Sequence, residues 1–127
     1  MNYLLDTHVV LWAAANSKEL SENAKTIILD ANAPKYVSII SAWEVAIKLG
    51  THKLYIDGGL PEFYRMIDNN GFYTIGIERE YISLLEQLPQ IHRDPFDRML
   101  IATALAEDFT LVTIDENIQK YDVPQLW

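Results

Sequence analysis

The chain lacks several residue types and patterns, and each absence excludes a class of protein. It contains no cysteine, which excludes a disulfide scaffold, thiolate zinc sites, iron–sulfur clusters and thiol catalysis. Ten Lys and Arg face eighteen Asp and Glu, so with a formal net charge of −8 it is not a basic module that coats nucleic acid. No apolar run approaches the roughly 18 residues of a membrane span, and no secretory leader pattern is present. We therefore expect a soluble, cytoplasmic protein that does not bind membranes.

Glycine-rich phosphate-binding loops are also missing. The sequence has neither G-x-x-x-x-G-K-[ST] nor G-x-G-x-x-G, so we expect no nucleotide cofactor. What is present is a chain of 127 residues, half of them hydrophobic, without a charge run, repeat or low-complexity tract. This length buries enough surface for one stable core. We expect a single domain over residues 1–127.

Short apolar runs alternate with longer amphipathic stretches. Runs rich in β-branched and aromatic residues predict strands over 3–5, 36–40, 72–75 and 110–114, with a short fifth strand over 121–123. Helical periodicity predicts helices over 9–15, 21–31, 42–49, 60–69, 77–88 and 95–107. The strands are almost continuously hydrophobic, as parallel strands covered on both faces are. The sequence therefore predicts an α/β fold, a central parallel sheet of four to five strands with helices on both faces.

Four acidic residues occupy equivalent places in this scheme. Asp6 and Asp115 directly follow two of the predicted strands. Glu44 lies about one turn into the helix after the second strand, and Asp97 lies in the first turn of the helix that begins at Pro95. Side chains at the carboxyl ends of parallel strands, and in the first turns of the helices that follow, gather at one edge of the sheet. Open α/β sheets bind their ligands at that edge.

Each acid also has a purely structural interpretation. Ser41 and Glu44 have the spacing of a capping box, Ser-x-x-Glu. Asp94 precedes a proline and so matches a helix N-cap followed by proline at the first helical position, and Asp97 matches an acid that complements the helix dipole. Asp6 can cap the helix that follows it, and Asp115 can cap a short helix that starts at Glu116.

The four acids together favour a different explanation. Capping needs only an oxygen, so Ser, Thr and Asn should share these positions with Asp and Glu. Carboxylates crowded into a cleft repel one another by on the order of 4 kcal/mol for a pair at about 4 Å and an effective dielectric near 20. A bound cation removes this repulsion, and hard oxygen ligands suit Mg²⁺ or Mn²⁺ rather than zinc. The sequence therefore favours a divalent-metal site.

Four short segments carry a resemblance to a known family. They are Leu-Leu-Asp-Thr-His at 4–8, Ser-Ala-Trp-Glu-Val-Ala-Ile-Lys at 41–48, Asp-Pro-Phe-Asp-Arg-Met-Leu-Ile-Ala at 94–102 and Leu-Val-Thr-Ile-Asp at 111–115. In this order and spacing they resemble the PIN-domain family of metal-dependent ribonucleases, and more closely the VapC-type toxins of bacterial and archaeal toxin–antitoxin pairs. The resemblance runs through essentially the whole chain.

The resemblance implies a PIN-like fold and an endoribonuclease that hydrolyses RNA phosphodiester bonds with Mg²⁺ or Mn²⁺. Water is then the nucleophile, and the products carry a 5′-phosphate and a 3′-hydroxyl. The family's catalytic and metal-binding residues correspond to Asp6, Glu44, Asp97 and Asp115. We expect Asp6 and Asp97 to bind the metal directly. Asp115 and Glu44 then bind it through water or position the nucleophile.

Three further residues have two interpretations each. Asp94 is an additional acid that could orient the metal ligands or bind a second ion, but the Asp-Pro pattern favours a helix cap. Thr7 and Thr113 could orient carboxylates through hydrogen bonds. Turn and strand propensity explain these two threonines equally well.

Basic residues near the motifs are candidates for contact with RNA phosphate, namely Lys48, His92, Arg93 and Arg98. Lys48 stands four residues after Glu44, so an ion pair within the helix is an equally good interpretation. Arg98 stands four residues after Asp94 and has the same ambiguity.

The resemblance also implies protein partners besides the RNA substrate. VapC-type toxins typically form homodimers and are bound by an antitoxin, VapB-like or of another type, whose helix lies in an apolar groove. Trp12 and Trp43 fall on helices that would line such a groove, with core packing as the alternative for both. A competing hypothesis is a non-catalytic α/β interaction or phosphate-binding module whose acids serve as helix caps. Metal-dependent RNA cleavage distinguishes the two.

Overall fold

The computed structural model describes every residue from Met1 to Trp127. Its elements follow in the order β1 (Tyr3–Leu5), α1 (Thr7–Ala14), α2 (Glu22–Leu29), β2 (Lys35–Ser38), α3 (Ile39–Gly50), α4 (Gly59–Asn69), β3 (Tyr73–Ile75), α5 (Arg79–Gln87), α6 (Pro95–Glu107), β4 (Thr110–Val112), a short 3-10 helix η1 (Ile118–Lys120) and β5 (Gln125–Leu126). Strands and helices alternate, as predicted.

The five strands form one parallel sheet in the order β3-β2-β1-β4-β5, which confirms the predicted fold class. The first strand of the chain, β1, lies at the centre, where Leu4 pairs with Tyr36 of β2 and with Leu111 of β4. Leu4 and Leu5 are both fully buried but belong to different hydrophobic clusters, because successive side chains of a strand point to opposite faces. Burial on both faces explains why the strands are apolar throughout.

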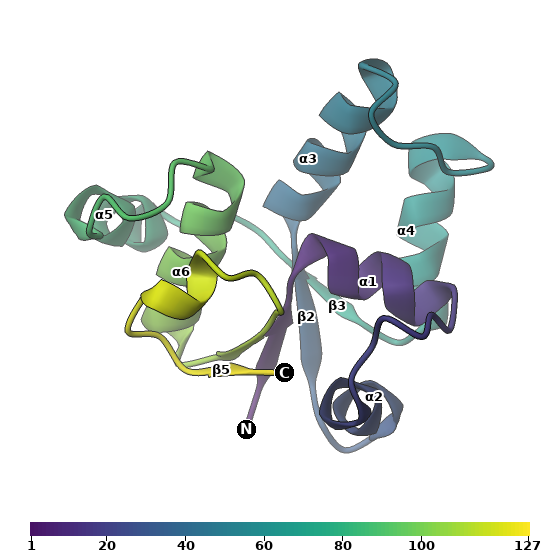
Figure 1. Cartoon of the computed structure of the whole chain (residues 1–127), viewed down its shortest axis with the longest axis horizontal. Helices are drawn as coiled ribbons and strands as arrows, with labels where there is room; N and C mark the ends of the chain where they lie inside the picture. The colour runs from purple at the N-terminus through teal and green to yellow at the C-terminus, as the bar shows by residue number, and fades with distance from the viewer.

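Helices cover both faces of the sheet (Figure 1). α5 and α6 lie on one side, and α1, α2 and α4 lie on the other. The helix α3 contributes to both layers, since Ile40 packs in the cluster that contains Leu100 of α6, and Val45 packs in the cluster that contains Phe63 of α4. None of the helices combines the length and the apolar character needed to cross a membrane.

The start of α3 differs from the prediction. The strand β2 ends at Ser38, whose side chain caps the helix by accepting a hydrogen bond from the backbone N of Ile40 at 3.1 Å. The helix therefore begins at Ile39, three residues before the predicted start at residue 42. The predicted capping box of Ser41 and Glu44 is wrong, because Ser41 is already inside the helix.

The last strand also differs from the prediction. It occupies Gln125–Leu126 rather than residues 121–123. Tyr121 and Val123 are buried in the cluster packed around α6, and the backbone N of Leu111 donates to the carbonyl of Pro124 at 2.8 Å, just before the pairing with β4 begins. The other helices and strands agree with their predicted ranges to within two residues.

Candidate active site

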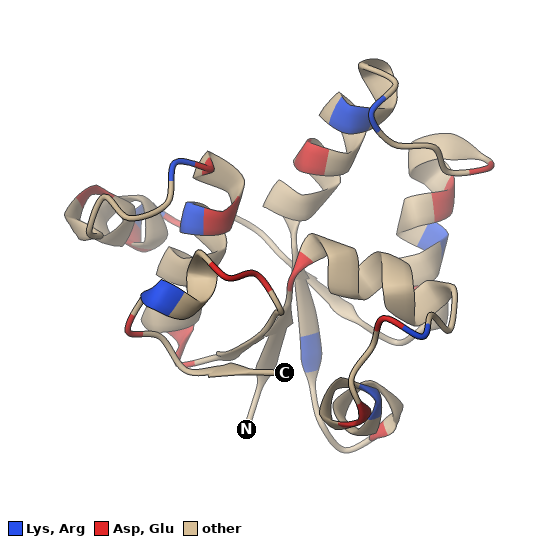
Figure 2. Ribbon diagram, viewed as in Figure 1, with Lys and Arg blue, Asp and Glu red and all other residues tan.

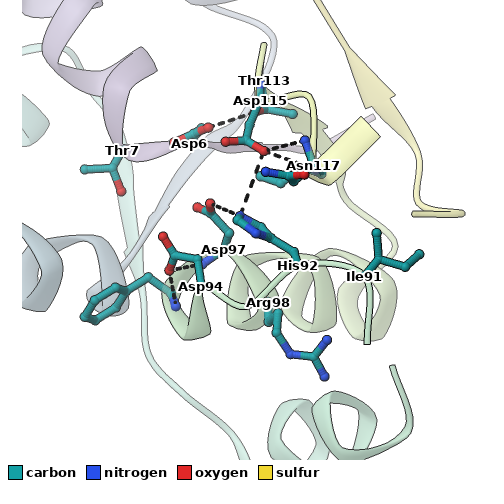
Figure 3. A network of polar contacts seen from close by, with 12 residues as sticks. Asp6, Thr7, Ile91, His92, Asp94, Asp97, Arg98, Thr113, Asp115 and Asn117 are labelled. Atoms are coloured by element: carbon teal, nitrogen blue, oxygen red, sulfur yellow. Dashed lines mark hydrogen bonds and ion pairs between the residues drawn. The ribbon is translucent and has the colours of Figure 1, made fainter. Parts of the chain in front are cut away.

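Asp6 lies directly after the central strand and caps α1. Its Oδ1 accepts a hydrogen bond from the backbone N of His8 at 3.3 Å, and its Oδ2 accepts one from Thr113 Oγ1 at 2.7 Å. Thr113 directly follows the neighbouring strand β4, so it orients this carboxylate from the next strand, one of its two predicted roles (Figure 3). Only 6% of Asp6 is exposed, and this burial raises the pKa of its carboxyl against the opposing effect of the Thr113 hydroxyl.

Glu44 projects from the second turn of α3 and is buried. Thr7 Oγ1, at the start of α1, donates to Glu44 Oε1 at 2.8 Å and lies 2.9 Å from Ser41 Oγ. Glu44 Oε2 accepts from Lys48 Nζ at 2.8 Å. Thr7 thus orients a carboxylate, and the hydrogen bond from Lys48 to Glu44 raises the pKa of the lysine despite its partial burial.

Two acids lie at the start of α6. Asp94 is the N-cap: its Oδ1 accepts from the backbone N of Phe96 at 2.8 Å and of Asp97 at 3.3 Å, as the Asp-Pro pattern predicts. Asp97 accepts no backbone hydrogen bond. Instead its Oδ2 lies 2.8 Å from Nε2 of His92, which donates when the ring carries its proton there. Asp97 is therefore not a helix cap.

Asp115 follows β4 and holds the turn before η1. Its Oδ1 accepts from the backbone N of Asn117 at 2.8 Å and of Ile118 at 2.9 Å. The expected cap of a helix from Glu116 is wrong, because the short helix begins at Ile118 and its N-cap residue is Asn117. Asp115 instead closes the turn that precedes this helix. The same oxygen lies 4.0 Å from His92 Nε2, so the histidine ring stands between Asp97 and Asp115.

The carboxylates form one electrostatically coupled cluster, and in Figure 3 those of Asp6, Asp94, Asp97 and Asp115 lie around a common region. Asp97 is only 8% exposed, and its pKa is raised to about 7, first by burial and then by the negative charges of Asp6, Asp94 and Asp115. Glu44 in turn raises the pKa of Asp6. Acidic positions after β1 and β4 and on α3 and α6 thus lie around the carboxyl edge of the sheet (Figure 2), and their charges influence one another.

The donor set fits a divalent cation. One ligand atom each from His92, Asp94 and Asp97 lie within 4.8 Å of one another. Oδ1 of Asp97 and Oδ2 of Asp94 and of Asp115 accept no hydrogen bond from the protein, so each cap or ion pair leaves a second oxygen available. Carboxylate oxygens held on rigid elements are the ligands that Mg²⁺ and Mn²⁺ prefer.

The basic residues near the motifs take different places. Lys48 forms the ion pair with Glu44, and its side chain is 37% exposed. Arg93 is exposed. Arg98 is 7% exposed and donates to the carbonyls of Leu85 and Pro89 and to the Tyr121 hydroxyl. The predicted phosphate contact of Arg98 is therefore wrong, because its guanidinium is buried in the protein interior, and it makes no ion pair with Asp94.

Two contacts of this site had no local sequence signal. His92 precedes the N-cap by two residues, which indicated nearness to the site but not contact with Asp97. The hydroxyl of Tyr121 bonds the backbone N of His92, 29 residues away along the chain. Only the packing of the C-terminal segment against α6 brings these two residues together.

This architecture defines an α/β protein with an acidic, oxygen-rich site at the carboxyl edge of a parallel sheet. The family model described as the PIN domain matches residues 3–124, and the chain belongs to the PIN-domain family. The curated relative Ribonuclease VapC22 of Mycobacterium tuberculosis is 28% identical over 123 residues, which cover 96% of this chain and 93% of the relative.

Solved structures show the same fold. VapBC2 from Rickettsia felis, bound to a DNA fragment from its promoter, has a chain with a TM-score of 0.76 and 17% identity, and the match covers 100% of this chain and 99% of that chain. DNA-bound VapBC from Salmonella typhimurium gives a TM-score of 0.69 at 12% identity over 99% of this chain and 97% of that chain. The predicted PIN-like fold is confirmed.

Proposed function

We propose that this chain is an endoribonuclease that needs Mg²⁺ or Mn²⁺ and that serves as the toxin of a toxin–antitoxin pair, acting as one PIN domain. The observation that carries the proposal is the meeting of Asp6, Glu44, Asp97 and Asp115, from four separate segments, at the carboxyl edge of the sheet. Similarity to Ribonuclease VapC22 over nearly the full length supports the activity.

In this proposal Asp6 and Asp97 would hold the cation directly, and Glu44 and Asp115 would hold it through water or position the nucleophile. A bound cation would supply positive charge for the phosphoryl oxygens and lower the pKa of the attacking water. Asp115 Oδ2, which accepts no hydrogen bond from the protein, orients that water. Thr113 and Thr7 fix the carboxylates of Asp6 and Glu44, so that little reorganisation is needed during the reaction.

The excess of acid must be offset for a polyanion to bind. A divalent cation contributes two positive charges in the cleft. Lys48 already stands beside the acids and is attracted by Asp94 and Asp97 as well as by its partner Glu44. We assign phosphate contacts to Lys48 and to the exposed Arg93.

Apolar surface on α3 supports the proposed antitoxin partner and homodimer. Ile39, Trp43 and Ile47 recur every four residues and are 40%, 59% and 41% exposed, so they form one stripe along the helix. Trp43 packs edge-on against Phe96, with ring centroids 5.4 Å apart, and both rings line an apolar hollow between α3 and the start of α6. Trp12, in contrast, is half-buried against Trp127. The fold shared with chains of VapBC complexes supports a bound antitoxin.

The test is cleavage of long RNA by the purified protein, with millimolar Mg²⁺ or Mn²⁺ and with chelator. We expect cleavage only with metal, and loss of cleavage in Asp6→Asn and in Asp97→Asn, which remove charge without changing shape. The matched control is Asp30→Asn: Asp30 Oδ1 also holds a turn, by accepting from the backbone N of Asn32 at 2.9 Å, but lies at the end of α2.

Full activity in both site variants would refute the metal assignment. Absence of cleavage by the wild-type protein under all metal conditions would favour the non-catalytic module. In support of the nuclease, neither Asp97 nor Glu44 caps a helix. The place of Asp97 in the first turn of α6 also complements the helix dipole.

A further inference from the structure

The segment between α5 and α6, residues 88–94, is held by two buried side chains from outside it. The Tyr121 hydroxyl donates to the carbonyl of Pro89 at 2.8 Å and accepts from the backbone N of His92 at 2.9 Å. It also lies 3.3 Å from the backbone N of Ile91. Arg98 Nη1 donates to the same Pro89 carbonyl at 2.8 Å and to the Tyr121 hydroxyl at 2.9 Å. Figure 3 shows Arg98 directed away from the carboxylates.

The hydroxyl has one donor and two acceptor positions. Its proton goes to Pro89, and three N–H groups, of Ile91, His92 and Arg98, share the two acceptor positions. Tyr121 is 5% exposed and Arg98 is 7% exposed. The arginine has no carboxylate partner: its remaining bond, from Nη2, goes to the carbonyl of Leu85 at 3.2 Å. A buried guanidinium paired only with neutral groups is costly for the folded state. Stability alone therefore does not explain this arrangement.

The held segment presents His92 to the acidic cluster. The backbone N of His92 is bound to Tyr121, and the ring on the other side of the residue lies 2.8 Å from Asp97 Oδ2 and 4.0 Å from Asp115 Oδ1. The side chain of His92 is only 14% exposed. The main chain and the ring of His92 are thus both held in place. Because the ring contacts Oδ2 of Asp97, it fixes the direction in which the free Oδ1 of that carboxylate points.

We propose that Tyr121 and Arg98 are positioning residues of the candidate nuclease site. They act through the segment 88–94, holding His92 against Asp97 so that this carboxylate keeps the orientation needed to bind the cation. The inference rests on the proposed function, but the position of the His92 side chain that it requires can be tested without an activity assay.

The first experiment compares Tyr121→Phe with Tyr81→Phe. Tyr81 is a matched control, because it is 1% exposed and its hydroxyl also donates a partly buried hydrogen bond, to Glu107 at 2.6 Å, at the far end of α6. We expect both variants to melt at a lower temperature than the wild type. Only Tyr121→Phe should lower kcat, by about 10- to 100-fold with KM little changed, as loss of support behind a metal ligand does. Equal kcat values in the two variants would overturn the proposal.

The second experiment asks whether Tyr121 acts through His92. Tyr121→Phe is introduced into a His92→Ala protein, and the effects on kcat are compared with those of the single changes. We expect Tyr121→Phe to have almost no further effect once the imidazole is absent. Additive losses would show that Tyr121 acts by another route and would refute the proposal.

The third experiment needs no RNA and no metal. The chain has three histidines, His8, His52 and His92, so imidazole resonances of ¹⁵N-labelled protein can be assigned by single substitutions. In Tyr121→Phe and in Arg98→Lys at one fixed pH, we expect the His92 signals to shift or broaden while those of His52 stay in place, and Tyr81→Phe to change neither. Unchanged His92 signals in Tyr121→Phe refute the positioning role, whereas a wild-type protein without nuclease activity but with these shifts refutes only the proposed function.

Discussion

Replacing Asp97 by Asn should stabilise the metal-free protein at neutral and alkaline pH. The folded-state pKa of Asp97 is about 7, whereas an Asp in an unfolded chain titrates near 3.9. Below about pH 4 both states carry the proton. As the pH rises toward 7 only the unfolded chain releases it, so the folded protein loses stability over that window. At 1.36 kcal/mol per pKa unit, the largest loss of folding stability caused by Asp97 is about 4 kcal/mol, reached above pH 7.

We expect the Asn variant to gain about half of that amount, because the neighbouring acids share the repulsion that an ionised Asp97 creates. A gain of about 2 kcal/mol corresponds to a melting temperature higher by roughly 6–12 °C for a domain of this size. The assay is thermal unfolding in chelator at pH 4 and pH 8, with Asp30→Asn as control. The gain should be present at pH 8 and largely absent at pH 4. A loss of stability at both pH values would contradict the crowded-carboxylate explanation.

Three further predictions follow from the same geometry. Millimolar Mn²⁺ or Mg²⁺ should raise the melting temperature of the wild type, because a ligand of the folded state stabilises it, and the Asp6→Asn, Asp97→Asn double variant should lose most of this rise. Thr113→Val removes the hydroxyl that donates to Asp6, so it should lower kcat and should lower the free energy of unfolding, measured in urea, by about 1–3 kcal/mol. Its control is Thr103→Val, a buried threonine whose hydroxyl donates only to a carbonyl within α6, and this change should leave kcat unaltered. Trp43→Ser should weaken antitoxin binding, measured by calorimetry, with little effect on stability, since this side chain is 59% exposed. An unchanged affinity would exclude the α3 stripe as the antitoxin-binding surface.

The sequence was informative where local pattern and topology agree. Asp6 follows a short apolar strand, and Asp94 precedes a proline, so strand end and helix cap were both predictable. Parallel pairing of β1 and β4 then brings Asp6 to Thr113 as a consequence of topology. The family motifs add the expectation that all four acids share one site.

The sequence was misleading where a tertiary contact decides the outcome. Arg98 has the residue type and the place of a phosphate ligand, yet its acceptors are carbonyls of α5 and its following segment and a tyrosine 23 residues away. Glu44 had the spacing of a capping box, but β2 ends at Ser38, which caps a helix that begins at Ile39. The partners of Arg98, and Thr7 beside Glu44, lie outside any local window.

The central place of β1 has a consequence for synthesis of the protein. Asp6 is made 107 residues before Thr113, the hydroxyl that orients it, and Asp115 follows two residues later still. At about 5–20 residues per second this interval lasts roughly 5–20 s. During that time the nascent chain gains Glu44 and then Asp97, but it still lacks Asp115, and β1 has no neighbour on the β4 side. An activity that requires all four acids can therefore begin only after Asp115 has been synthesised and β4 has paired with β1.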